Sequence, residues 1–205
     1  MHKFFLTLFI ILFCSLSLSA KEVKPYSMRF VYGMPTSNDL GEVLSGQFGA
    51  NYHDFRIYSL DGGYLLKESA FNLPLDFYLK SGLSYYDEGR YKNAYGADIY
   101  IKAFWNFDFA KNRVRLGFGE GISYTSRVLM SEYFDATANN DNTSKFLNYL
   151  DISLDFDFGR LVGSTSLRDL YVGFVIKHRS GIFGTINNVK HGGSNYNSLY
   201  IEKKF

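Results

Sequence analysis

The sequence contains a single cysteine, Cys14, and this residue lies in an apolar run close to the amino terminus. Residues 1–20 combine a short basic start, that apolar run and small residues at their end, which is the layout of a secretory signal peptide. We expect this segment to be removed, so that residues 21–205 form one domain with neither a disulfide nor a thiolate metal site. A lipid anchor on Cys14 is not expected, because Phe13 precedes it where lipoprotein signals have glycine or alanine.

The chain also lacks a strong net charge, a second long apolar run and a cluster of histidines. Its formal net charge is only +2, which gives no reason to expect a nucleic-acid partner. No later apolar stretch approaches the ~18 residues that a membrane-spanning helix needs. The histidines beyond the signal, His53, His178 and His191, are scattered, so neither a metal site nor a cofactor is expected.

Aromatic residues, in contrast, are abundant: they make up 19% of the chain, with 17 tyrosines and 20 phenylalanines against one tryptophan. Membrane barrels use such rings on their lipid face and at the two membrane interfaces. Past the signal, apolar and polar residues alternate with period two, most clearly over residues 73–79. The alternation predicts that the domain is built from β-strands.

The pattern predicts eight strands, an even number that lets both ends of the chain lie on one side of a membrane. The predicted strands are 27–33, 53–69, 73–86, 94–108, 112–125, 146–159, 168–180 and 195–205. The long, mostly polar connections are 34–52, 87–93, 126–145 and 181–194, and the short ones are 70–72, 109–111 and 160–167. Outer-membrane barrels have long outer loops and short periplasmic turns, so this asymmetry predicts the orientation.

Charged residues repeat on one face of several predicted strands. Carboxylates such as Asp151, Asp155 and Asp157 would be intolerable in a dry core, but the lumen of a barrel can pair them with basic residues. The candidate basic partners are Lys80, Lys102, Arg113, Arg115, Lys177 and Arg179. The chain also ends in Phe205, which is similar to the terminal aromatic assembly signal of outer-membrane proteins.

These patterns favour an all-β fold, an eight-stranded antiparallel transmembrane β-barrel of the bacterial outer membrane. The alternative is a soluble β-sandwich or lipocalin-like barrel, whose strands also alternate but whose apolar face points inward. Side chains fill the interior of a barrel of eight strands. We therefore expect a poor pore, with any chemistry on the outer wall or in the loops.

His178 and Ser180 occupy the same face as the apolar residues Val172, Phe174 and Ile176 near the outer end of the seventh predicted strand. A serine hydroxyl becomes a nucleophile when a neighbouring imidazole takes its proton, and residues two apart on one strand face are close enough for this. The alternative is that both are polar residues of the membrane interface, where such side chains cost little. If the pair is catalytic, its position at the outer leaflet indicates a lipid substrate.

This arrangement resembles the outer-membrane lipid A 3-O-deacylase family (PagL-like acyloxyacyl hydrolases), small eight-stranded barrels with an H-x-S-N motif near the end of the chain. The resemblance implies that Ser180 is the nucleophile and His178 its base, on the lipid-facing wall, and that lipopolysaccharide is the substrate. In that family a glutamate of the last strand orients the histidine.

The sequence departs from the family pattern at two positions. Gly181 follows the serine where the motif has asparagine, and its backbone N–H is a candidate oxyanion donor. Near the position of the glutamate stands Asn195, whose carbonyl oxygen can accept an imidazole N–H, so that a Ser–His–Asn triad is expected. The only acid of the last strand, Glu202, is expected to face the lumen.

Two further groups of acidic residues need an account. Glu120 stands in the outward register of its strand, and we expect a bulge at Gly117, Gly119 and Gly121 to turn it inward, the alternative being a lipid-facing carboxylate. The acidic segment of residues 132–142 lacks the spacing of a calcium loop, so we expect a solvated outer loop there.

The leading hypothesis is a lipid A deacylase that acts in the outer membrane without a cofactor. The other hypothesis is a non-catalytic barrel whose outer loops bind a host surface or a neighbouring protein. The sequence also leaves a homodimer open.

Overall fold

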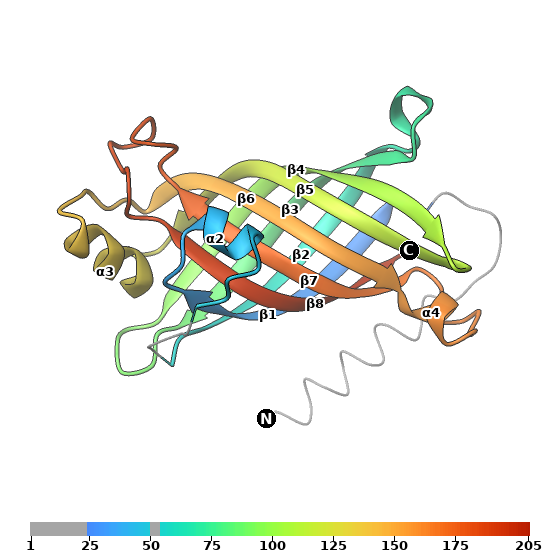
Figure 1. Ribbon diagram of the computed structural model, residues 1–205, viewed down its shortest axis with the longest axis horizontal. Helices are drawn as coiled ribbons and strands as arrows, with labels where there is room; N and C mark the ends of the chain where they lie inside the picture. The colour runs from blue at the N-terminus through green and yellow to red at the C-terminus, as the bar shows by residue number, and fades with distance from the viewer. Residues whose placement is uncertain (1–23, 50–53) are drawn as a thin grey trace.

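The protein is described from a computed structural model, which covers residues 24–49 and 54–205 (Figure 1). The predicted signal peptide, residues 1–20, and His53 lie outside the described residues.

Eight antiparallel strands form a closed barrel in which each strand pairs with the next and β8 pairs with β1. The strands are β1 (Tyr26–Thr36), β2 (Arg56–Lys67), β3 (Leu75–Asp87), β4 (Ala94–Phe109), β5 (Asn112–Thr125), β6 (Phe146–Asp157), β7 (Leu170–Ser180) and β8 (Ser194–Lys204). The predicted fold and the number of strands are confirmed, and the strand ends differ from the prediction by a few residues.

The two ends of the barrel differ as the connection lengths indicate (Figure 1). One end carries α2 (Leu40–Leu44), α3 (Met130–Ala138) and the β7–β8 loop, and we refer to it as the outer end. The opposite end has shorter connections with the 3₁₀ turn η1 (Ala70–Asn72) and α4 (Phe158–Leu161). None of the helices in the described ranges is long and apolar enough to cross a membrane.

The lumen holds charged side chains in pairs rather than an apolar core. Asp151 accepts hydrogen bonds from Arg29 and Lys102, and all three side chains are fully buried. At the next level Arg115 contacts Asp155 at 2.7 Å and Glu202 at 2.9 Å. Arg113 was also predicted to be a lumen partner, but it pairs instead with the exposed Asp108 near the β4–β5 turn. These pairs fill the interior, so the barrel has a packed lumen.

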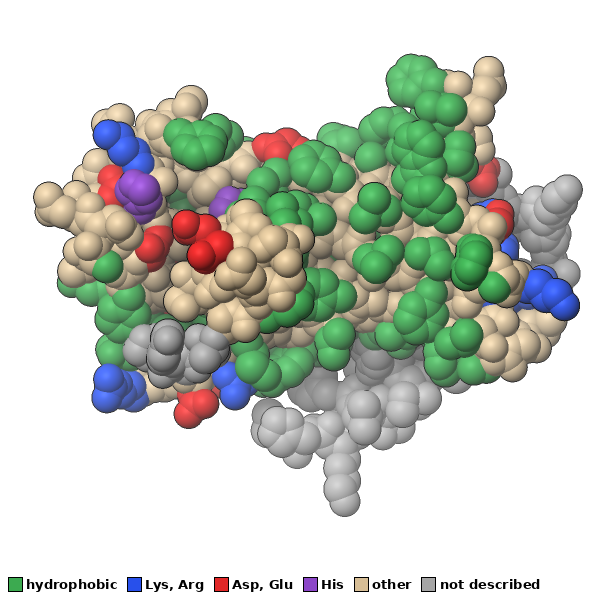
Figure 2. Space-filling view, in the orientation of Figure 1, with side chains coloured by type: hydrophobic (Ala, Val, Ile, Leu, Met, Phe, Trp, Pro, Cys, Tyr) green, Lys and Arg blue, Asp and Glu red, His purple; other side chains and the backbone are tan. Residues whose placement is uncertain are grey.

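The outer wall carries the apolar side chains of each strand. Leu83 is 70% exposed and Leu199 is 66% exposed, and Figure 2 shows hydrophobic side chains spread over the middle of the barrel, with most of the charged residues toward its ends. A soluble barrel has the opposite distribution, with apolar residues inside. The soluble sandwich or lipocalin-like alternative is therefore wrong.

The acidic segment of residues 132–142 is not a solvated loop throughout. Its first part belongs to α3, and Glu132 is fully buried at the mouth of the lumen, where Arg179 contacts it at 2.8 Å. Ser194 donates a hydrogen bond of 3.0 Å to the same carboxylate. The prediction failed for Glu132 because a lumen arginine needs a counter-charge, and α3 supplies it.

Candidate functional site

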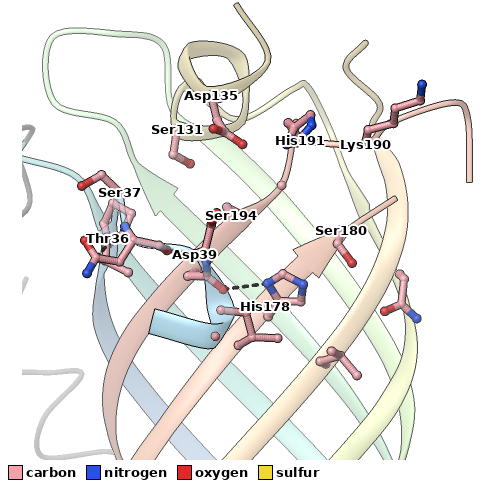
Figure 3. Close-up of a pocket in the computed structure, with 18 of the residues that line it drawn as sticks. Thr36, Ser37, Asp39, Ser131, Asp135, His178, Ser180, Lys190, His191 and Ser194 are labelled. Carbon is pink, nitrogen blue, oxygen red and sulfur yellow. Dashed lines mark hydrogen bonds between the residues drawn. The ribbon is translucent and has the colours of Figure 1, made fainter. Parts of the chain in front are cut away.

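The alternation of β7 sends His178 and Ser180 to the outer wall and Arg179 to the lumen. Both His178 and Ser180 are half-buried, while Arg179 is buried and bonded to the Ser123 hydroxyl at 2.9 Å. Figure 3 shows the two side chains on the same side of β7 near its outer end. The sequence-based placement of the pair on the outer wall agrees with the structure.

The ring of His178 is held by Asn195, its register partner on β8. The Nδ1 atom of His178 lies 2.6 Å from the Oδ1 atom of Asn195, and this contact is the dashed line in Figure 3. The amide of Asn195 is oriented in turn, because its Nδ2 donates to the backbone oxygen of Asn38 at 2.9 Å. The oxygen of the amide therefore faces the ring, so Nδ1 carries the proton and Nε2 keeps its lone pair.

The Ser180 hydroxyl lies on the same face of β7 as this ring. Within residues 24–49 and 54–205, no hydrogen bond joins Ser180 to His178. Catalytic hydrogen bonds are often long in the absence of substrate and tighten when it binds. The strand spacing keeps both groups on one face, two residues apart, which is within the reach of such a contact.

Gly181 directly follows the serine, and its surroundings explain why no asparagine stands there. A Cβ atom at this position would come within 2.0 Å of the backbone oxygen of Val189. The backbone oxygen of Gly181 accepts a hydrogen bond of 2.8 Å from Ile186 N–H, which fixes the start of the β7–β8 loop. A glycine is therefore needed for the loop to pack so closely against the end of β7.

The β1–β2 loop folds back against the outer wall beside the site (Figure 1). Its helix α2 begins at Leu40, and the preceding N-cap residue, Asp39, donates its N–H to the side chain of Glu42 at 3.0 Å in a capping box. Farther along, Phe48 packs edge-on against Phe174 of β7, with ring centroids 5.7 Å apart. Together with the bond from Asn195 to Asn38, this contact makes the loop one side of the site.

A groove with a volume of about 940 Å³ opens between this loop, α3, the β7–β8 loop and the barrel wall (Figure 3). His178 and Ser180 lie on its floor. The apolar side chains that line it include Leu40, Leu44, Leu150, Ile182 and Phe183. Such a groove has the size and the mixed lining of a site for a ligand with a long apolar part.

Charged groups stand at the outer end of the groove. They include Asp135, Lys190 and His191. Asp141 accepts the backbone N–H groups of His191 at 2.5 Å and of Lys190 at 2.6 Å, and these donors lower the pKa of its carboxyl to about 2. The ionised carboxylate anchors the β7–β8 loop to the segment that follows α3.

Glu120 faces outward, so the predicted bulge is wrong. The pairing of β5 with β4 and with β6 runs through Glu120 without a shift in register. The nearby glycines serve the lumen instead: a Cβ at Gly117 would come within 2.6 Å of the Lys102 side chain, and one at Gly119 within 2.9 Å of Tyr100. Absent side chains on β5 thus make room for large lumen side chains on β4.

Asn148 is a residue of the groove that the sequence reasoning missed. It pairs in register with Ser180, and its Nδ2 donates to Glu120 Oε1 and, at 3.1 Å, to the backbone oxygen of Gly121. The sequence contained a signal for this residue, because Asn148 is a polar residue in the apolar register of its strand, as His178 is in β7.

Glu202 faces the lumen as expected, where it binds Lys80 and Arg115.

Comparisons with known proteins give a fold but no family. No protein family model matches the sequence, and no curated protein is significantly similar to it. The crystal structure of the outer membrane enzyme PagL is similar with a TM-score of 0.59 and 14% identity, over 87% of this chain and 99% of that chain. The crystal structure of Neisserial surface protein A is similar with a TM-score of 0.52 and 15% identity, over 89% of this chain and 98% of that chain. The chain therefore has the fold of eight-stranded outer-membrane barrels.

Proposed function

We propose that the protein is an outer-membrane enzyme that hydrolyses an ester-linked acyl chain of lipid A. The observation that carries this proposal is the bond between His178 and Asn195, which leaves a basic ring nitrogen beside a serine on a lipid-facing wall. An interface residue without a role does not need its ring fixed by a second residue that is itself fixed. The similarity to the enzyme PagL in fold is consistent with this activity.

In the proposed reaction the acyl chain lies along the apolar lining of the groove. Ser180 Oγ attacks the ester carbonyl carbon while His178 Nε2 takes the hydroxyl proton. The N–H of Gly181 stabilises the oxyanion, and the imidazolium returns its proton to the leaving sugar oxygen. Water then attacks the acyl-serine, again through His178, and releases the fatty acid. Asn195 orients the ring throughout, and no cofactor takes part.

The outer end of the groove suits the other half of this substrate. The ester chains of lipid A lie just below phosphorylated sugars, and Lys190 is an exposed cation at that level of the groove. A flexible ammonium group binds phosphate as a point charge. The apolar floor and the charged rim thus match the two ends of a lipopolysaccharide molecule.

The test is to express the protein in a lipopolysaccharide-producing bacterium and to compare lipid A masses for the intact form and for Ser180→Ala. We expect the loss of one acyl chain with the intact form only. Ser166→Ala, a change in the loop at the opposite end of the barrel, is the matched control and should behave as the intact form. Unchanged lipid A with a folded, membrane-embedded intact protein contradicts the proposal.

A second candidate function is a non-catalytic surface barrel whose outer loops bind a partner. The similarity in fold to Neisserial surface protein A favours this second function as much as the similarity to PagL favours an enzyme. The sequence identities of this chain to the two proteins are nearly equal. The same experiment separates the two candidates, since a binding barrel leaves lipid A unchanged. Nothing in the described residues or in the comparisons supports a homodimer.

A further inference from the structure

Glu120 is an exposed carboxylate on an otherwise apolar part of the wall. Its neighbours in the same register, Phe118 and Ile122, are 51% and 44% exposed. An ionisable group on the lipid face of a barrel destabilises it, to a degree that depends on depth. Such a residue inside a membrane marks a functional site by default.

The carboxylate is held in place by Asn148, and this contact leaves two acceptors unused. Both amide hydrogens of Asn148 are engaged, one by Glu120 Oε1 and the other by the backbone oxygen of Gly121. Within the described part of the chain, no donor is bonded to Glu120 Oε2 or to Asn148 Oδ1. The pair therefore presents hydrogen-bond acceptors, and no donors, to the groove.

The strand register places these acceptors beside the proposed nucleophile. Asn148 is the register partner of Ser180, so their Cβ atoms are about 5 Å apart. Glu120 is in one lateral row with Leu150 and His178, two strands and about 10 Å from the histidine. All of these residues line the groove. The acceptors thus flank the site on the side of β5 and β6, opposite Asn195.

The chemistry of the pair excludes several kinds of ligand. Phosphate would be repelled by the carboxylate, and ester oxygens are themselves acceptors. A divalent cation such as calcium needs six or more oxygen ligands, and no group of three His, Cys, Asp or Glu side chains comes together in the described ranges. An O–H or N–H donor fits this pair, and each donor hydrogen would satisfy one of the two unused acceptors.

We propose that Glu120 and Asn148 select ester lipids that carry a hydroxyl or amide N–H next to the scissile ester. Lipids whose ester region holds only acceptors, such as diacyl glycerophospholipids, are rejected because they cover Glu120 Oε2 and Asn148 Oδ1 without supplying a donor to either. A site built to bind a donor discriminates strongly against an analogue without it. This inference rests on the proposed function and adds to it the feature by which the enzyme recognises its substrate among the lipids of the membrane.

The experiment measures binding, so that it does not depend on turnover. Ser180→Ala protein in detergent micelles is titrated calorimetrically with methyl myristate, methyl 3-hydroxymyristate and a myristoyl ester of N-acetylglucosamine. Methyl myristate carries no donor, and methyl 3-hydroxymyristate carries a hydroxyl on the acyl chain. The N-acetylglucosamine ester carries its donors on the sugar, and these include the amide N–H. We expect at least one donor-bearing probe to bind about tenfold more tightly than methyl myristate, and the arm that does so identifies the source of the donor.

Adding Glu120→Leu to the Ser180→Ala protein should make the affinities for the donor-bearing probes and for methyl myristate nearly equal. Glu120→Gln keeps an acceptor, so it should retain part of the preference for the donor-bearing probes. Glu68→Leu, at an exposed position near the opposite end of the barrel, is the control and should leave the ratio unchanged. Equal affinities for all probes, or a preference that survives Glu120→Leu, would overturn the inference. If the preference is found but the intact protein leaves lipid A unchanged in the bacterium, the proposed function fails and the selectivity stands.

Discussion

The lumen and the groove on the outer wall both contain polar and charged side chains, but these side chains differ in how completely they are paired. In the lumen Asp151 has Arg29 and Lys102 as partners, and every member of this group is buried. In the groove Glu120 is bonded through one oxygen only, and His178 keeps one ring nitrogen without a partner in the described residues. Polar groups that are fully paired stabilise the barrel, whereas groups left partly unpaired on the wall remain available to a ligand.

The largest effect is expected when the support of the histidine is removed. Asn195→Leu takes away the acceptor of His178 Nδ1, so the ring loses both its orientation and its tautomer. We expect hydrolysis to fall by about 10²–10⁴-fold, the usual contribution of a general base. Asn195→Asp should keep activity at or above the original level, because a carboxylate accepts the same N–H and stabilises the imidazolium. Equal losses in both variants would contradict this role.

In the lumen, loss of a central carboxylate should lower stability rather than activity alone. Asp151→Ala leaves the buried charge of Lys102 without a carboxylate and removes one of the two carboxylates of Arg29, which keeps Asp61, and we expect a loss of about 3–5 kcal/mol in the free energy of unfolding. Urea unfolding followed by gel mobility of unheated samples measures it. Asp54→Ala, at a side chain that is 97% exposed, is the control. Replacing all three lumen residues by apolar ones should cost less than Asp151→Ala, and the reverse order would contradict the argument.

A smaller, pH-dependent effect is expected at the outer mouth of the barrel. Burial raises the pKa of Glu88 from 4.5 to about 7, and the carboxylate accepts the backbone N–H of Met130. A raised pKa means that the folded state holds a proton that the unfolded state has released. The contribution of Glu88 to stability is therefore fully present below pH 4.5 and is lost as pH rises through about 7. Thermal unfolding between these values should show the decline in the intact protein.

Glu88→Gln has no carboxyl group to ionise at this position. Its melting temperature should therefore change less over the same pH range. An identical pH dependence in both proteins would show that Glu88 is not the group responsible.

The smallest effect concerns the β1–β2 loop, which forms one side of the site. Phe48→Ala removes one edge-on contact with Phe174, and such a contact contributes about 0.5–1.5 kcal/mol. We expect proteolysis of the β1–β2 loop to accelerate by no more than about tenfold, with the stability of the barrel unchanged. Phe109→Ala, at an exposed position of the opposite end, should leave the rate at this loop unaltered.

The sequence was sufficient to predict the features that depend on strand alternation. The eight strands, the charged lumen and the outward direction of His178 and Ser180 all follow from period two, because side chains of a strand must point to one face or the other. Asn148 was within reach of the same rule. The alternation also placed Glu120 correctly, and the error arose from interpreting neighbouring glycines as a bulge when they make room for Lys102 and Tyr100.

Strand alternation does not predict the contacts between loops and the barrel. Glu132 is buried because Arg179 lies at the mouth of the lumen, and Asn38 meets Asn195 because the β1–β2 loop turns back over the wall. Both contacts join segments that are far apart in the sequence, and neither is encoded in the local pattern. The parts of the groove that come from loops therefore appear only once the barrel has closed.

The bond from Asn195 to Asn38 makes the proton on the histidine ring depend on a backbone oxygen 157 residues away in the chain. If the β1–β2 loop lifted from the wall, the amide of Asn195 would lose the acceptor that orients it and would be free to turn over. Its NH₂ group would then face Nδ1, and the proton of the ring would move to Nε2. In that state the histidine would have no lone pair to offer the serine, although every side chain of the site would still be present.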